Sequence, residues 1–239
     1  VPAGDIGVGV REIGYLFGQY KRLTNRYDAG VLTGKGLGWG GSLIRTEATG
    51  YGTVLFAQSM LATTGQDLEG KRVAVSGAGN VAIYAIEKAQ QLGATPVTIS
   101  DSSGWVLDED GIDLELLKQV KEVERGRVSD YVARKPGAEL RTEGRPWSVP
   151  VDVALPCATQ NELGLDDARD LLRNGVSVVA EGANMPCTPE AIEAFQEASV
   201  LYAPGKASNA GGVATSALEM EQNASRTRWD AETAEARLT

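Results

Sequence analysis

A glycine turn between an apolar run and a helical pattern constrains this chain more than any other feature. Residues 71–76 (KRVAVS) form a short β-branched run, and a helical pattern ending at Gly93 follows. The turn between them has the form G-x-G-x-x-A. Its first glycine permits a tight bend, its second lets a diphosphate approach the backbone, and its alanine allows close packing of helix on sheet. We therefore expect a dinucleotide at the amino end of this helix, in contact with Gly77, Ala78, Gly79, Asn80 and Val81.

Strands and helices alternate after this turn. A second strand is expected at residues 95–100, and later apolar runs at 151–155, 176–180 and 200–203 are separated by helical patterns. This order predicts an α/β fold, a doubly wound, mostly parallel Rossmann-like sheet with flanking helices. The predicted organisation is a helical remnant of a preceding domain at 1–33, a dinucleotide-binding domain at 34–208, and a helix at 209–239 that returns toward the preceding domain.

The end of the second strand bears on the choice of dinucleotide. Asp101 lies 22 residues after Gly79, where an acid normally receives the ribose hydroxyls of NAD. Hydroxyl and basic side chains that could instead favour NADP are Ser100, Ser102, Ser103, Lys121, Arg125 and Arg127. The last three belong to segment 118–147, which holds eight Lys or Arg against five Asp or Glu, and which could equally be a solvated charged face. The residues alone leave NAD and NADP open.

Composition excludes several classes of function. With 42% apolar and 23% charged residues among 239, the chain can bury a core, and its net charge of -9 disfavours nucleic acid and anionic membranes as partners. The absence of histidine excludes every mechanism that needs imidazole. Cys157 and Cys187 are expected to be buried free thiols. Residues 108–110, all acidic, are expected to form a solvated turn rather than a metal site, and no metal is expected.

Three polar stretches follow apolar runs and are candidates for ligand contacts. They are residues 157–163 (CATQNEL), 181–186 (EGANMP) and 209–216 (NAGGVATS). In an open α/β sheet, ligands bind at the carboxyl ends of the strands, so Asn184, Asn209 and Ser216 are candidates to face the reacting groups. The alternative is that these stretches are only helix caps and turns.

The motifs taken together resemble a known family. VPAGDIGVG, TGKG, SLIRTEATGYG, SGAGNVA, SDSSG, PCATQNEL, AEGANMP and APGKASNAGGVATS occur in this order along the whole chain. This series is similar to the hexameric glutamate dehydrogenases, and SDSSG resembles their NADP-dependent branch. The resemblance implies NADP rather than NAD, a homo-oligomeric, hexameric parent, and L-glutamate, 2-oxoglutarate and ammonia as the reactants.

The resemblance also implies roles for individual residues. Arg45 and Thr49 would lie near the nicotinamide end of the cofactor, Asn80 would follow the diphosphate, and Asn184 and Asn209 would approach the carboxamide. Val213 and Ser216 would line the substrate pocket, with Ser216 donating to the side-chain carboxylate of glutamate. The full set expected to bind cofactor is Arg45, Thr49, Gly77, Ala78, Gly79, Asn80, Val81, Ser100, Asp101, Ala158, Thr159, Gln160, Asn184 and Asn209.

The catalytic lysine and aspartate of the family precede the position of Val1, so we expect a fragment with no catalytic residue of its own. Because no run approaches 18 apolar residues and the start lacks the pattern of a signal peptide, we expect a cytoplasmic protein. Two alternatives stay open. One is a dehydrogenase of another amino acid, such as leucine or phenylalanine, and the other is a non-catalytic nucleotide-binding module.

Overall fold

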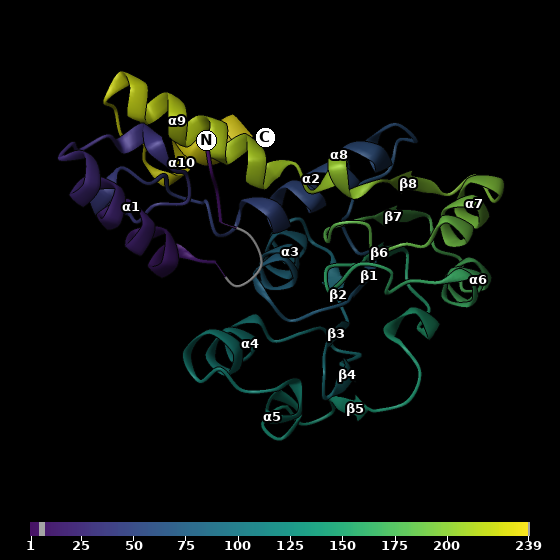
Figure 1. Ribbon diagram of the computed structural model, residues 1–239. Helices are drawn as coiled ribbons and strands as arrows, with labels where there is room; N and C mark the ends of the chain where they lie inside the picture. Colours follow the sequence, from purple (N-terminus) through teal and green to yellow (C-terminus); the bar gives the residue numbers. More distant parts are fainter. Residues whose placement is uncertain (5–7, 239) are drawn as a thin grey trace. The chain divides into compact units, whose positions relative to one another are not determined.

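The glycine turn follows β1, a strand of a five-stranded sheet whose strands all run parallel (Figure 1). We describe a computed structural model, which covers residues 1–4 and 8–238; residues 5–7 of the VPAGDIGVG motif lie outside the described residues. The strands, in spatial order, are β2 (Thr95–Pro96), β1 (Arg72–Val75), β6 (Val153–Leu155), β7 (Val178–Ala180) and β8 (Leu201–Ala203). The expected α/β, mostly parallel, Rossmann-like fold is confirmed.

Alternate residues of the central strands face two different hydrophobic clusters. In β1, Val73 and Val75 belong to one cluster, whereas Ala74 belongs to the other. Strands β6 and β7 follow the same rule. Because successive side chains of a strand point to opposite faces, both faces of this sheet are buried. This explains why the runs read as continuously apolar rather than alternating.

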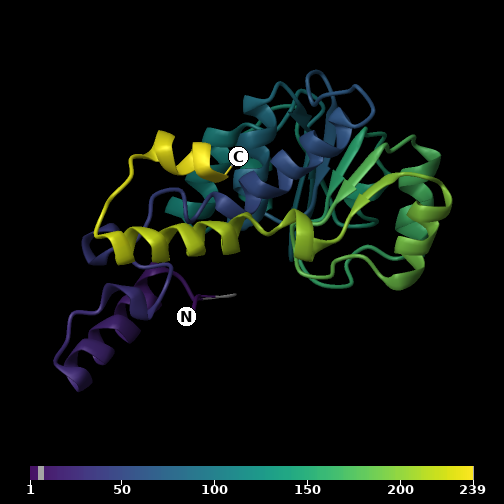
Figure 2. The same cartoon turned by 90° about the horizontal axis from the view of Figure 1, so that it is seen from above.

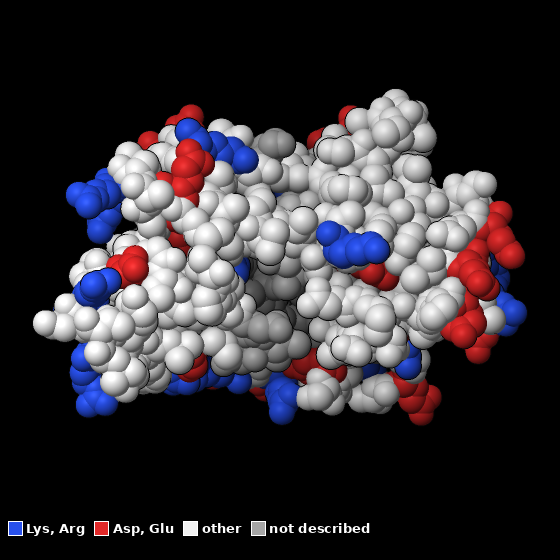
Figure 3. Space-filling view, turned by 45° about the horizontal axis from the view of Figure 1, so that its top comes forward, with Lys and Arg blue, Asp and Glu red and all other residues white. Residues whose placement is uncertain are grey.

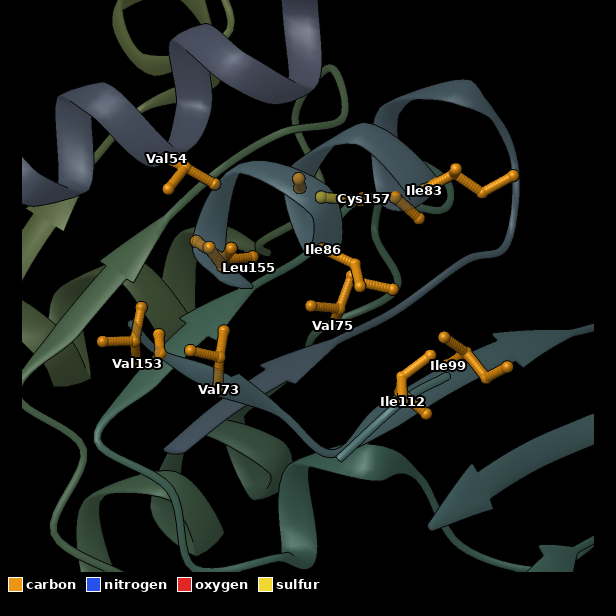
Figure 4. Packing of buried hydrophobic residues seen from close by; sticks show 14 of the residues in the cluster. Val54, Val73, Val75, Ile83, Ile86, Ile99, Ile112, Val153, Leu155 and Cys157 are labelled. Carbon is orange, nitrogen blue, oxygen red and sulfur yellow. The ribbon is translucent and has the colours of Figure 1, made fainter. Parts of the chain in front are cut away.

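Helices α2 (Ala48–Ala62) and α3 (Asn80–Gln91) cover one face of the sheet. Val54 of α2 and Ile83 and Ile86 of α3 pack with the valines of β1 and β6, as Figure 4 shows. The two helices approach closely at Gly50, where a Cβ atom would lie 2.5 Å from the backbone nitrogen of Ala85. Glycine at this position therefore sets the contact between the helices.

Helices α6 (Leu165–Arg173) and α7 (Pro189–Glu197) cover the opposite face. Leu171 and Phe195 are fully buried there, and Figure 2 shows these green helices and the blue helices α2 and α3 on opposite sides of the strands. Helices on both faces make the sheet doubly wound. A short helix, α8 (Gly205–Ser208), follows β8.

One expected strand is divided between two sheets. The run 95–100 was expected to be a single strand, but only β2 joins the parallel sheet, and β3 (Thr98–Asp101) pairs antiparallel with β4 (Gly104–Leu107). β4 in turn pairs antiparallel with β5 (Glu139–Arg141). The reason is the sequence Asp101-Ser-Ser-Gly104, which forms a tight hairpin: Asp101 accepts a hydrogen bond from the amide of Ser103, and Gly104 has φ of 139°.

The segment between β4 and β5 is helical. It contains α4 (Leu114–Lys118), a π-helical turn, η3 (Gln119–Val123), and α5 (Val128–Val132), and the 3-10 turn η4 (Pro146–Ser148) follows β5. Tyr131 of α5 is fully buried; its hydroxyl donates to Asp108 at 2.8 Å and accepts from the amide of Asp113 at 2.9 Å. The expectation of a solvated turn at 108–110 is therefore wrong for Asp108, which is 1% exposed and anchors α5 through this bond.

Contacts along the chain separate it into two units, Thr49–Ala210 and Val1–Ala48 with Gly211–Thr239. The sequence interpretation placed its boundaries at residues 33 and 208. The second unit contains α1 (Val10–Thr24), η1 (Ala29–Val31), η2 (Leu37–Trp39), α9 (Gly211–Ser225) and α10 (Ala231–Leu238). Its small core contains Ile13 and Phe17 of α1, so these apolar residues of the amphipathic helix α1 pack within this unit.

Surface charges are mixed. On the face shown in Figure 3, Lys and Arg side chains lie in small groups close to Asp and Glu side chains. Helix α6 illustrates the pattern, since Arg169 pairs with Asp166 and Arg173 with Asp170 one turn away. Among the described residues, no helix combines the length and the apolar character that crossing a bilayer requires.

Candidate functional site

The first glycine of the turn is required by the chain itself. Gly77 has φ of 85°, which favours glycine, and a Cβ atom there would lie 3.0 Å from the carbonyl oxygen of Cys157. The amide of Gly77 donates to the hydroxyl of Ser100 at 2.8 Å, and the amide of Ser100 donates to the carbonyl of Gly77 at 3.1 Å. These two bonds fix the turn against the start of the hairpin.

The second glycine is not required by the chain. Gly79 has φ of -92°, which any residue adopts, and apart from its two neighbours in the chain no described residue has an atom within 4 Å of the place where its Cβ would be. Gly79 is the N-cap residue of α3, and no side chain caps this helix. The glycine therefore leaves an open approach to the helix end.

The backbone amides of Asn80, Val81 and Ala82 have no acceptor among residues 1–4 and 8–238. Unpaired amides at a helix amino end carry a partial positive charge and are suited to bind an anion. A 12-residue helix such as α3 presents them at the carboxyl edge of the sheet, where β1 ends. The predicted contact residues Gly77, Ala78, Gly79, Asn80 and Val81 form this turn and the start of α3, with Ala78 buried and Asn80 exposed.

Asp101, at the end of β3, has both carboxylate oxygens engaged by the chain. One oxygen accepts from the amide and the hydroxyl of Ser103, at 2.8 and 2.6 Å. The other accepts from Lys121 Nζ and from the amide of Val128, both at 3.0 Å. Burial alone would raise the pKa of Asp101, but the bonds from Ser103, Lys121 and Val128 outweigh it and lower that pKa. Asp101 is therefore an ionised anchor with little acceptor capacity left for ribose hydroxyls.

The basic segment does return to the second strand. Besides the pair of Lys121 with Asp101, the guanidinium of Arg127 donates to the hydroxyl of Ser102, and both of these side chains are exposed. Arg125 is exposed as well and has φ of 56°. Two of the three basic residues that the sequence singled out thus lie beside the hairpin that bears Asp101.

The loop after β6 lies against the glycine turn. Ala158 is half-buried, and Thr159 and Gln160 are exposed at the same edge of the sheet. The hydroxyl of Ser76 accepts from the amide of Cys157 at 2.9 Å and donates to Glu162 at 2.8 Å. The loop that carries the three predicted residues is therefore tied to the residue that precedes Gly77.

The loops after β7 and β8 meet through two asparagines. The side-chain amide of Asn209 donates to the side-chain oxygen of Asn184 at 2.8 Å and to the carbonyls of Gly182 and Ala183 at 3.3 and 3.4 Å. Behind them, the buried carboxylate of Glu181 accepts from the hydroxyl of Tyr202 at 2.8 Å and from the amide of Gly205 at 2.7 Å. The two asparagines that the sequence singled out are thus brought together.

The remaining predicted residues are Thr49 and, in the second unit, Arg45, Val213 and Ser216; they differ in burial and in hydrogen bonding. The backbone carbonyl of Thr49, in the first turn of α2, accepts from the hydroxyl of Thr53 at 2.8 Å. Burial lowers the pKa of Arg45, and its Nε is buried with no acceptor in the described part of the chain. Val213 is 74% exposed, whereas Ser216 is 7% exposed and its hydroxyl donates to the carbonyl of Gly212 at 3.1 Å.

The described residues contain no cluster of His, Cys, Asp or Glu side chains that could hold a metal ion. Both cysteines are free and buried. The chemistry of the site is therefore that of backbone amides, amides of asparagine, and hydroxyl and basic side chains around an open helix end.

The sequence profile of the glutamate/leucine/phenylalanine/valine dehydrogenases matches residues 40–239. The chain belongs to this dehydrogenase family. An NADP-specific glutamate dehydrogenase of Escherichia coli K12 is 60% identical over the whole chain, and an NAD(P)-specific glutamate dehydrogenase of Xylanibacter ruminicola is 58% identical. The chain spans about half, 54%, of the length of each of these relatives.

A solved structure supports the family assignment. The crystal structure of Plasmodium falciparum glutamate dehydrogenase superposes with a TM-score of 0.96 at 47% identity, and the match covers 99% of this chain and 51% of that one. The family assignment thus agrees with the resemblance of the motifs and with the fold.

In this member of the dehydrogenase family, three charged residues that the sequence did not single out have structural roles: Lys35 and Glu181 are buried and Glu162 is half-buried. Glu162 and Glu181 each lie within a polar stretch that was singled out, but their roles as acceptors were not predicted. Lys35, in the glycine-rich loop at 34–42, forms a buried ion pair with Glu219 at 2.5 Å. The available signal for Lys35 was a charge inside a glycine-rich loop, and for Glu181 it was an acid directly after the apolar run 176–180; no local signal marked Glu162.

Proposed function

We propose that this chain is the cofactor-binding portion of an NADP-dependent glutamate dehydrogenase, an enzyme that oxidatively deaminates L-glutamate to 2-oxoglutarate and ammonia. The observation that carries the proposal is the uncapped amino end of α3 beside Gly79, which nothing in the described chain fills. The family and the names of the similar proteins support the reaction. When bound, NADP would supply the hydride acceptor.

The diphosphate fits the turn at the start of α3. Three amides, those of Asn80, Val81 and Ala82, are available to donate to its oxygens, and the missing side chain of Gly79 leaves the approach clear. The net charge of the chain is negative, so this anion must be held by local donors and the dipole of α3 rather than by a general positive field.

The 2′-phosphate of NADP fits the hairpin between β3 and β4 better than a free ribose does. The carboxylate of Asp101 is already saturated by four donors and its charge is compensated by Lys121. The exposed side chains of Ser102 and Arg127 then provide a hydroxyl and a guanidinium for a phosphate. We infer that Ser102, Lys121 and Arg127 favour NADP over NAD, with Ser100 fixing the turn beside them.

The nicotinamide half is assigned to the loops after β6, β7 and β8. The pair of Asn184 with Asn209 offers amide groups suited to a carboxamide, and the exposed Thr159 and Gln160 lie at the same edge of the sheet. Following the family resemblance, we assign Arg45 and Thr49 to the neighbourhood of the nicotinamide. Val213 and Ser216 are assigned to the substrate, which requires the hydroxyl of Ser216 to leave the carbonyl of Gly212.

The residues that would carry the catalytic proton transfers in the family are assigned to the part of the relatives' length that this chain does not span. A homo-oligomeric parent and a cytoplasmic location stay predictions. A dehydrogenase of another amino acid would share the cofactor site, so the choice of substrate is tested only in a full-length protein.

Titration calorimetry of this chain with NADP and with NAD tests the proposal. We expect NADP to bind, and to bind at least about tenfold more tightly than NAD, a difference of about 1.4 kcal/mol. Tighter binding of NAD would show that Asp101 serves the ribose, and no binding of either nucleotide would rule out the cofactor-binding assignment.

A further inference from the structure

One half-buried carboxylate joins the two loops that meet at the glycine turn. Glu162 accepts, through a single oxygen, a hydrogen bond from the hydroxyl of Ser76 at 2.8 Å and another from the amide of Ala158 at 2.9 Å. The same hydroxyl of Ser76 accepts from the amide of Cys157 at 2.9 Å. Ser76 follows β1 and Ala158 follows β6, so Glu162 links the ends of two adjacent strands.

At this link, the backbones of the two loops are in close contact. A Cβ on Gly77 would be 3.0 Å from the carbonyl oxygen of Cys157 and 3.2 Å from the Cα of Ala158. A shift of the 157–158 backbone would therefore either press on Gly77 or release it. Since Gly77 begins the turn that leads into α3, the position of this loop controls the direction of the amides at the helix start.

The charge of Glu162 opposes anion binding, which makes its presence informative. Burial raises the pKa of this carboxyl, and the bonds from Ser76, Ala158 and Thr159, with the charge of Arg145, only partly offset that effect. A half-buried acid next to a site for a diphosphate costs affinity through repulsion when it is ionised. Its value to the site must therefore lie in the hydrogen bonds that it accepts.

The other charged groups around Glu162 do not provide a second explanation. The guanidinium of Arg145 donates to the backbone carbonyl of Glu162 and pairs with the carboxylate of Asp167 at 3.2 Å, so it is divided between these two acceptors. Cys157 and Cys187 are buried thiols whose pKa values are raised, first by burial. None of these groups replaces the acceptor that Ser76 and Ala158 use.

We propose that Glu162 is a positioning residue for the cofactor, which holds the 157–160 loop against Ser76 and thereby sets the glycine turn for the diphosphate. This inference rests on the proposed function, because it requires a dinucleotide at the start of α3. Glu162 acts through Ser76 and Ala158 and does not itself touch the cofactor. What matters is an acceptor oxygen at this place rather than a negative charge.

The same two strands carry a matched control at their opposite ends. The carboxylate of Asp152, just before β6, accepts from the amide of Arg72, the first residue of β1, at 2.8 Å. It therefore joins β1 to β6 at the amino edge, as Glu162 joins their continuations at the carboxyl edge. A loss of general stability would be common to both sites, whereas a loss of cofactor affinity is expected only at Glu162.

The test compares Glu162→Ala, Glu162→Gln and Asp152→Ala by calorimetry with NADP, with thermal unfolding as the measure of stability. Glu162→Ala should weaken binding about tenfold or more, which corresponds to about 1.4 kcal/mol. Glu162→Gln keeps an acceptor oxygen and loses the charge, so it should bind within about twofold of the wild type or more tightly. Asp152→Ala should lower the unfolding temperature and leave the affinity unchanged.

Two results would overturn the inference: unchanged affinity in Glu162→Ala, or a loss in Glu162→Gln as large as that in Glu162→Ala. If Glu162→Ala does not fold, Ser76→Ala and Ser76→Thr replace it. Ser76→Ala should weaken the binding of NADP, whereas Ser76→Thr, which keeps the hydroxyl, should bind NADP as the wild type does. Equal affinities of these two variants would refute the proposal. A wild-type chain that binds no nucleotide would contradict the proposed function itself, so the two failures are distinguishable.

Discussion

The turn between β1 and α3 and the hairpin between β3 and β4 are both assigned to the same cofactor, but they are built in different ways. The turn consists of consecutive residues, Gly77 to Ala82, whose free amides belong to one helix end. The hairpin depends on distant residues, since Asp101 is held by Lys121 and Val128, 20 and 27 positions further on. Under the proposed assignment, a local motif would bind the part common to all dinucleotides, and a tertiary arrangement would bind the part that distinguishes them.

This difference has a physical reason. A diphosphate is recognised by its charge, and a helix amino end supplies a partial positive charge wherever a helix starts. Discrimination between a hydroxyl and a phosphate at one ribose carbon requires side chains at defined positions. Those side chains are positioned by the α4, η3 and α5 segment, which Tyr131 anchors through Asp108 and Asp113.

The largest expected effect comes from filling the turn. Gly79→Ala places a methyl group where, apart from the two neighbours in the chain, no described residue has an atom within 4 Å and where φ is permissive, so the fold should tolerate it within about 1 kcal/mol. The methyl group should block the diphosphate and weaken both NADP and NAD about 100-fold, as measured by calorimetry.

A matched glycine is available for this comparison. Gly18 in α1 also has open space at its Cβ, and Gly18→Ala should leave both affinities unchanged. If Gly79→Ala and the wild type bind nucleotide equally well, the diphosphate does not bind at this turn. The comparison between the turn and the hairpin as two parts of one cofactor site would then be wrong.

The next effect separates the two nucleotides. Arg127→Ala removes an exposed guanidinium beside Ser102, so NADP should bind about tenfold more weakly while the affinity for NAD stays the same. Arg134→Ala, which removes an exposed guanidinium paired with Glu124, is the control and should change neither affinity. A parallel loss of NADP and NAD affinity in Arg127→Ala would mean that the hairpin is not the discriminating region.

A smaller effect is expected at the anchor of the hairpin region. Tyr131→Phe removes a buried hydroxyl that joins Asp108 and the amide of Asp113, and it leaves both without that partner. The free energy of unfolding, measured with urea, should fall by about 1–3 kcal/mol. The affinity for NADP should change no more than about threefold, because the other contacts of α5 persist. An unchanged free energy of unfolding would contradict this anchoring role.

The smallest effect concerns pH. The pKa of Glu162 is raised in the folded chain, mainly by burial, so the folded state binds a proton more readily than the unfolded state does. Stability contributed by this group therefore falls as pH rises from the unfolded value through the raised folded value. Glu162→Gln cannot titrate, so it should unfold at a higher temperature than the wild type near neutral pH. That advantage should shrink as the pH is lowered, and a difference independent of pH would show that the carboxyl is not perturbed in this way.

Much of the fold could be predicted from the sequence, for the reason that the parallel strands are apolar on both faces. Within the predicted ranges 151–155 and 176–180, the continuously apolar parts Val153–Leu155 and Val178–Ala180 form β6 and β7. The split of 95–100 could not be predicted, because the run is short and uninterrupted and only the strands with which its two parts pair, β1 for Thr95–Pro96 and β4 for Thr98–Asp101, divide it. Asp108 looked solvated because its burial depends on Tyr131, 23 residues away.

The candidate site shows the same division. The glycine turn and the pair of Asn184 with Asn209 follow from residue types at the carboxyl ends of strands. The saturation of Asp101 does not, since two of its four donors come from the far end of a helical segment. Glu162 was also beyond prediction, because nothing local distinguishes an acid that accepts from Ser76 from one that faces water.

Binding of the diphosphate at the start of α3 can be tested by following the backbone amide resonances of the isotope-labelled chain while NADP is added. We expect large shifts at Asn80, Val81 and Ala82, because their free amides would become donors to the diphosphate. The amide of Arg72, at the opposite end of β1 and bonded to Asp152, should not move. Shifts confined to other parts of the chain, with these three amides unchanged at saturating NADP, would contradict binding of the diphosphate at the start of α3.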